Sequence, residues 1–188
     1  MAHTQSTSYT RTPEERYFRW TDPRHLALAR ERRDLWRERA ALAEALPTSD
    51  MEAVDTLHAH GLRASTASLV EWLPAVDVVW LDGADDAERR AVRRRYSTWE
   101  AATDEGGALL EQWLQSRPPE SLFLVGRRVL AERLRALDAD ARRAARSRII
   151  AGCEAAGRAS GGFLGLGGLS ADERRTIESI RGDLTGTM

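Results

Sequence analysis

Two stretches of the 188-residue chain concentrate carboxylates in the same pattern, and carboxylates are the side chains that could do chemistry here. The first, residues 80–92, reads WLDGADDAERRAV and holds four acids between Asp82 and Glu88. The second, residues 165–177, reads GLGGLSADERRTI and aligns with the first without a gap, so that Glu173 matches Glu88. A repeated group of acids is typical either of a site for a hard cation or of a device that starts helices.

The helix-start interpretation accounts for part of each stretch. Asp85 with Glu88, and Ser170 with Glu173, have the spacing of a capping box. In that motif the first side chain accepts a backbone N–H three residues on, and the Glu side chain reaches back to the N–H of the first residue. The negative charge also lies at the positive end of the helix dipole. Capping therefore explains these four residues without a ligand.

Capping does not explain Asp77 and Glu154. Each lies four residues after an apolar residue of its own helix, Leu73 or Ile150, at the edge of the apolar stripe where desolvation of a carboxylate is costly. Each is followed by a glycine-bearing loop and then by a capped helix, and two such units could bring their acids together. Oxygen-only ligands favour Ca²⁺, Mg²⁺ or Mn²⁺ over zinc. The candidate metal ligands are Asp77, Asp82, Glu88, Glu154 and Glu173.

The segment DVVWLDGADDAERRAV resembles the first signature of the TerB-like family, the helical domain of tellurite-resistance TerB proteins and their relatives. That signature is an acid, four residues, an Asp-Gly pair, and a Glu that opens the next helix. The matching positions here are Asp77, Asp82, Gly83 and Glu88. Residues 154–177 resemble the second half of the domain, with Glu154 and Glu173 as its acids, and the similarity covers about residues 65–182.

The resemblance implies an all-helical domain of two related halves, with an acidic cluster proposed to hold metal and an association with stress-response or membrane-proximal complexes. The chain departs from the pattern at Gly167, which stands where the first half has Asp82. The second half has therefore lost one carboxylate. The segment before residue 65 lies outside the resemblance.

Helical periodicity recurs along the chain, with no sustained period-two alternation, and it predicts an all-α fold of eight or nine antiparallel helices. The strongest apolar stripe is formed by Leu69, Trp72, Leu73, Val76 and Trp80. Pro74 lies inside it and is expected to kink a helix or to start one. A short helix is expected to begin at Thr12. The other predicted helices cover residues 23–46, 48–61, 65–81, 86–102, 105–115, 119–137, 139–159 and 171–181. The expected domains are a disordered tail (1–10), an N-terminal helical extension (11–62), the TerB-like domain (63–182) and a C-terminal tail (183–188).

Composition narrows the function classes. The formal net charge of −1 gives no overall attraction to nucleic acid or anionic membranes. The single cysteine, Cys153, excludes an intrachain disulfide and a multi-cysteine zinc site. No secretory signal and no membrane-spanning segment is visible, so we expect a cytoplasmic location.

No nucleophile elbow and no metalloprotease or deaminase spacing is present, so the sequence predicts a non-enzymatic binding or scaffold protein with a weak divalent-cation site. The alternative is a pure protein-interaction module whose acids serve only as caps and arginine partners. Its N-terminal extension would dock a larger assembly, with Trp20 and Trp36 as candidate partner-binding residues.

The arginines of residues 89–95 are interpreted as a solvated helix face paired to acids of neighbouring helices, so no nucleic-acid partner is expected. The glycine stretch 160–168 lacks the Lys-Ser/Thr of a phosphate-binding loop and is expected to be a flexible loop.

Overall fold

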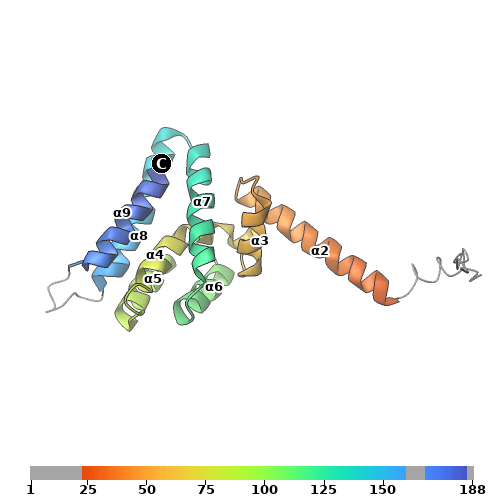
Figure 1. Cartoon of the computed structure of the whole chain (residues 1–188), viewed down its shortest axis with the longest axis horizontal. Coiled ribbons are helices and arrows are strands. Elements are labelled where there is room, and N and C mark those ends of the chain that lie inside the picture. The colour runs from red at the N-terminus through yellow and green to blue at the C-terminus, as the bar shows by residue number, and fades with distance from the viewer. Residues whose placement is uncertain (1–22, 160–167, 186–188) are drawn as a thin grey trace, which may run out of the picture. The chain divides into compact units, whose positions relative to one another are not determined.

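The structure, a computed structural model, describes residues 23–159 and 168–185, and the chain divides into two compact units, residues 1–38 and 39–188. Every regular element in the described ranges is helical, which confirms the predicted fold class (Figure 1). The elements are α2 (Pro23–Ala45), α3 (Met51–Ala59), the 3₁₀ helix η1 (Ala64–Trp72), α4 (Leu73–Val79), α5 (Asp86–Ser97), α6 (Asp104–Gln115), α7 (Glu120–Ala136), α8 (Ala139–Ala159) and α9 (Ala171–Thr185). The helix expected at Thr12 and the predicted loop over residues 160–167 lie outside the described residues.

Helix α4 forms the centre of the larger unit, and all seven of its residues are buried. It packs against α7, α8 and α9. Pro74 lies within the first two residues of α4, where the helix does not need its missing N–H. It therefore lies at the start of a helix, which is one of the two outcomes expected for it. The residues before it form the 3₁₀ helix η1 instead of α-helix. The predicted apolar stripe is buried at Leu69, Trp72, Leu73 and Val76 and half-buried at Trp80.

The end of α2 and all of α3 belong to the same core. Leu42, Leu46 and Leu57 are fully buried in it, so the boundary expected at residue 62 falls inside the larger unit. A helix was expected from residue 48, and that start is wrong, because α3 begins at Met51. Asp50 is the N-cap, because its carboxylate accepts the N–H of Ala53 at 3.0 Å, while the Thr48 hydroxyl donates to Glu132.

Two helices end elsewhere than predicted. Helix α5 ends at Ser97 instead of residue 102, because the Tyr96 hydroxyl holds the following turn by donating to the carbonyl oxygen of Thr103 and accepting its N–H, both at 3.0 Å. Helix α9 was expected to stop before Gly182, but it continues to Thr185. Leu184 is buried there, and its packing outweighs the low helix propensity of glycine.

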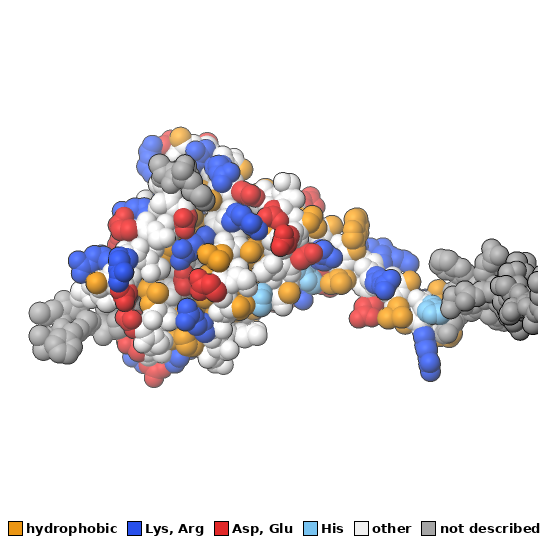
Figure 2. Space-filling view, in the orientation of Figure 1, with side chains coloured by type: hydrophobic (Ala, Val, Ile, Leu, Met, Phe, Trp, Pro, Cys, Tyr) orange, Lys and Arg blue, Asp and Glu red, His pale blue; other side chains and the backbone are white. Residues whose placement is uncertain are grey.

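The surface of the larger unit mixes both signs of charge. On the face seen in Figure 2, acidic and basic side chains alternate over the helices, with apolar side chains between them. That face shows no continuous basic stripe of the kind that nucleic-acid binding needs. No helix in the described part of the chain is long and apolar enough to cross a membrane.

Gly106 of α6 leaves room for the Tyr96 hydroxyl, which generates a prediction about stability. A Cβ at Gly106 would lie 2.3 Å from that oxygen, whereas one at Gly107 would meet Tyr96 at an ordinary 3.5 Å. We expect Gly106→Ala to lower the free energy of unfolding by about 1–3 kcal/mol, because a rigid ring with two hydrogen bonds must move. Gly107→Ala, the matched control, should be neutral or stabilising by up to about 1 kcal/mol. Urea unfolding of both variants measures this, and equal effects would contradict it.

Candidate functional site

Asp77, the first of the predicted metal ligands, is paired with an arginine. Its side chain is buried, and one oxygen accepts a hydrogen bond from Arg127 of α7. The other terminal nitrogen of Arg127 lies 3.4 Å from Asp183 of α9. One guanidinium therefore joins α4, α7 and α9 through two carboxylates, and Asp77 already has a cation.

The pKa of Asp77 is raised from its ordinary value of 3.8, because burial disfavours the charged form more than Arg127 favours it.

Burial also raises the pKa of the neighbouring Cys153 thiol, to about 12. A thiol with that pKa is protonated at neutral pH and is a poor nucleophile. Cys153 is fully buried in α8.

Glu88 and Glu173 form the two predicted capping boxes. Glu88 accepts the N–H of Asp85 at 3.1 Å, and the Asp85 carboxylate accepts the N–H of Glu88 at 2.8 Å. Ser170 and Glu173 exchange the same pair of bonds at 3.1 and 2.5 Å. Both glutamates are buried. Gly157 of α8 makes room for the second, because a Cβ there would lie 3.0 Å from its carboxylate.

The remaining two predicted ligands are separate from these. Glu154 is bonded to two arginines, Arg158 at 3.1 Å and Arg181 of α9 at 3.3 Å. Asp82 is exposed in the turn after α4, next to Gly83, whose φ of +87° favours glycine.

The five acids therefore do not form one cluster. In residues 23–159 and 168–185, no group of three or more His, Cys, Asp or Glu side chains is placed to hold a metal ion. Four of the five have arginine or backbone partners instead, and the fifth is solvated. Binding of Ca²⁺, Mg²⁺ or Mn²⁺ by these residues stays a prediction without structural support.

Of the two candidate partner-binding residues, one lies in the described part of the chain. Trp36 of α2 is 67% exposed, while Trp20 lies outside the described residues.

Two arginines of residues 89–95 contact other side chains of this protein. Arg93 makes two bonds to Glu111 of α6, at 2.5 and 2.7 Å, and Arg89 lies 5.6 Å from the centre of the Trp80 ring.

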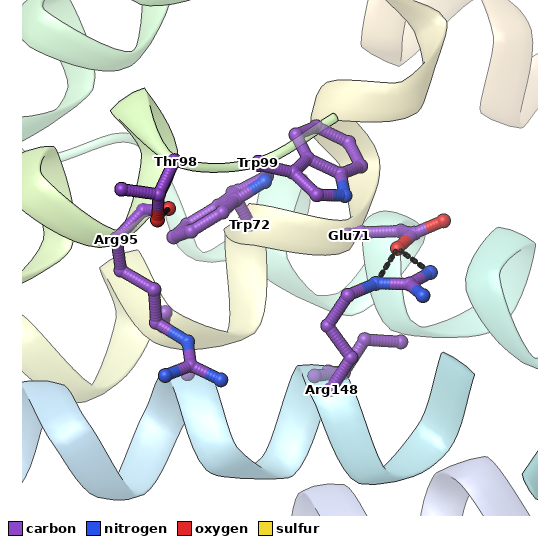
Figure 3. A pocket seen from close by; sticks show the side chains of 9 residues that line it. Glu71, Trp72, Arg95, Thr98, Trp99 and Arg148 are labelled. Carbon is purple, nitrogen blue, oxygen red and sulfur yellow. Dashed lines mark hydrogen bonds and ion pairs between the residues drawn. The ribbon is translucent and has the colours of Figure 1, made fainter. Parts of the chain in front are cut away.

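A cavity of about 240 Å³ opens where η1, α4, α5 and α8 meet. Figure 3 shows the indoles of Trp72 and Trp99 together, the guanidinium group of Arg95 over α8, and that of Arg148 turned toward Glu71. Arg148 is held by Glu71 through bonds of 2.7 and 3.3 Å to one carboxylate oxygen. The side chains combine aromatic surface with positive charge, which suits an anionic ligand with an apolar body.

A second cavity, of about 600 Å³, lies among α7, α8 and the end of α9 and is lined by several arginines. Most of these already have partners. Arg127 and Arg128 pair with aspartates, Arg142 donates to three carbonyl oxygens near the end of α7, and Arg146 donates to the carbonyl oxygen of Leu184. These arginines bond carbonyl oxygens at helix C-termini or pair with aspartates, of which Asp77 is buried, so the smaller cavity is the stronger candidate for a ligand.

Sequence reasoning did not find the smaller cavity. Trp72 was assigned to the core stripe, and it is buried there, but it also lines the cavity. Glu71 and Arg148 are 77 residues apart, and no local spacing connects them. The helical spacing of the apolar residues indicates that Trp72 is buried. It does not indicate that a cavity lies beside Trp72.

Searches against protein-family models, curated proteins and solved structures find no match for this chain. The resemblance of residues 65–182 to the TerB-like family stays a prediction from the motif alone.

The Asp77–Arg127 pair generates a prediction about stability. Arg127→Met leaves the Asp77 carboxylate buried without its cation and is expected to lower the free energy of unfolding by about 3–5 kcal/mol. Adding Asp77→Leu removes both charges and should restore most of the loss. The control is Arg143→Met, which removes an exposed ion pair with Asp140 and should change stability by less than about 0.5 kcal/mol. Denaturant unfolding at pH 7 measures all three, and a double variant no more stable than Arg127→Met would contradict the argument.

The raised pKa of Asp77 generates a prediction about pH. A carboxyl whose pKa is higher in the folded state binds more protons there than in the unfolded chain, so it lowers the free energy of unfolding as the pH rises through the interval between the two values. That interval begins at the ordinary value of 3.8. Asp77→Asn removes this titration, and its unfolding free energy minus that of the wild type should increase as the pH rises above 3.8.

Urea unfolding of both proteins across acidic to neutral pH measures this difference, in which the contributions of the other carboxyls cancel. The opposite slope would show that Arg127 outweighs burial and that the pKa of Asp77 is lowered.

Proposed function

We propose that this chain is a non-catalytic interaction module that docks a helix of another protein on the exposed apolar residues of α2. The observation that carries the proposal is the exposure of Leu28, Leu35 and Trp36, at 52%, 44% and 67%. Large apolar side chains exposed together on one element are typical of interaction sites. Apart from the solvated Asp82, the carboxylates proposed as metal ligands serve as caps and arginine partners, and metal binding has no part in the proposal.

The spacing of these residues fits a helical partner. Leu28 and Leu35 are seven residues apart and lie within about 20° of each other on the helix surface, and Trp36 follows at the neighbouring position. Two leucines one heptad apart, with an aromatic residue beside them, can pack against the apolar face of a second helix.

Charge favours an acidic partner. The part of α2 within residues 23–38 carries five arginines and three acids, an excess of two positive charges. Arg32 is about 40° from Leu28 and so lies within the apolar stripe itself. A carboxylate on the partner would neutralise it. A second copy of α2 would instead bring like charges together, and a lipid surface would draw Arg32 toward the acyl chains.

Site-specific crosslinking tests the proposal in the full chain. A photo-crosslinking amino acid in place of Trp36 should give an adduct with another protein in cells, whereas the same residue in place of the exposed Arg90 of α5 should not. The crosslinked peptide should come from an acidic amphipathic helix. A synthetic peptide of that sequence should then bind the purified full-length protein in calorimetry.

A charge substitution completes the test. Leu35→Glu should weaken binding of the peptide by about tenfold or more, because it places a carboxylate in the apolar stripe and repels the acidic partner. Leu124→Glu, at an exposed leucine of α7, is the matched control and should leave binding unchanged. An adduct between two copies of the chain, an adduct with lipid, or equal binding by both variants would contradict the proposal.

A further inference from the structure

The 240 Å³ cavity has a preformed aromatic wall. Trp72 and Trp99 meet edge to face, with ring centres 5.7 Å apart, and Tyr96 packs against both. Figure 3 shows the two indoles adjacent to each other above α8. Contacts within a cluster of three rings hold each ring in place, so a flat apolar ligand would bind without first ordering the wall.

Apart from Thr98, the remaining uncharged lining of the cavity is apolar. It is formed by Ala75 of α4 with Ile149 and Gly152 of α8. A Cβ at Gly152 would meet nothing closer than Arg95 Nε at 3.9 Å, so the glycine is not required there for close helix packing. Its missing side chain contributes open space to the cavity.

The three charged side chains that line the cavity differ in whether a described side chain of opposite charge pairs with them. The Glu71 side chain is 8% exposed and accepts from Arg148, and it also lies 3.6 Å from Arg133 outside the cavity. Arg95 is different. No carboxylate pairs with its guanidinium among the residues that the structure describes, although it lines the same cavity. Together, the cavity-lining residues Arg95, Arg148 and Glu71 carry a net charge of +1.

We propose that this cavity binds a small aromatic carboxylate, with the carboxylate on Arg95 and the ring against Trp72 and Trp99. A planar guanidinium can donate two parallel hydrogen bonds to a carboxylate. The net charge of +1 matches a monoanion, and Glu71 would repel a second negative charge. A volume of about 240 Å³ is smaller than the usual drug-sized site, which limits the ligand to one or two rings.

This site is independent of the docking function proposed for α2. Its residues come from η1, α4, α5 and α8, and none belongs to residues 23–38. Loss of one function therefore does not predict loss of the other.

Calorimetry with 2-naphthoate and the full-length protein tests the assignment. We expect a Kd on the order of 0.1–1 mM for a ligand of this size. Arg95→Met keeps the length of the side chain but removes the guanidinium, and it should weaken binding by at least about tenfold. The matched control is Arg94→Met, at the exposed neighbouring position, which should bind as the wild type does. The neutral 2-naphthalenemethanol should bind weakly, and equally, to all three proteins.

A second variant tests the space in the cavity. Gly152→Leu fills it and should abolish 2-naphthoate binding, while Gly182→Leu, in α9 with open space around its Cβ position, should not. Thermal unfolding shows whether each variant is folded. If Gly152→Leu is not folded, Gly152→Ala replaces it, because its added methyl group meets nothing closer than 3.9 Å. If Gly152→Ala binds 2-naphthoate more weakly than the wild type and its unfolding temperature is not lower, the conclusion is the same.

Several results would overturn the assignment. Absence of binding by the wild type at millimolar 2-naphthoate would show that the cavity is not such a site. Equal binding by the wild type and Arg95→Met, or by the acid and the alcohol, would remove the role of the charge. Binding of 2-naphthyl phosphate tenfold tighter than 2-naphthoate would show that a phosphate ester is the ligand class instead.

Discussion

Helix α4 is buried along its whole length, and Asp77 is its only charged residue. A carboxylate in that position is costly unless a cation reaches it, because a charge in an apolar interior loses its hydration. Arg127 of α7 supplies the cation, and Asp183 of α9 supplies a second carboxylate at the protein edge. A shift of α4 or α7 along its axis by one turn would separate the pair, so this interaction limits the registers in which the central helices can pack.

The acidic repeat is explained by the same need for partners. Glu88 and Glu173 accept backbone N–H groups at the starts of α5 and α9, and Glu154 is held between two arginines. All 28 basic residues of the chain are arginines, and a guanidinium has enough donors to bond more than one acceptor. Arg142 alone reaches three carbonyl oxygens. In the described residues, arginine side chains and backbone N–H groups are therefore the partners of these carboxylates, and arginine also bonds the carbonyl oxygens at the end of α7.

Local patterns in the sequence predicted the local structure well. The two capping boxes follow from spacings of a few residues, and both are present. Pro74 lies at the start of α4, which is one of the two outcomes expected for it. The pair of Asp77 with Arg127 spans 50 residues, and nothing near either residue indicates the other. Asp77 was correctly placed against the apolar stripe, but a buried acid can be relieved by a metal ion, a proton or an arginine. The choice among these depends on the packing of α7, which the sequence pattern does not contain.

The end of α5 shows the same limit at shorter range. Helix propensity allowed α5 to continue to residue 102, but the Tyr96 hydroxyl bonds to Thr103 and turns the chain. That turn places Trp99 against Trp72 and so forms the aromatic wall of the cavity. Arg95 lies on the last turn of the same helix, with no carboxylate opposite it in the described residues. Trp99 follows the end of α5 by two residues, so an aromatic surface and a cation without a carboxylate partner among the described residues line one cavity at this helix end.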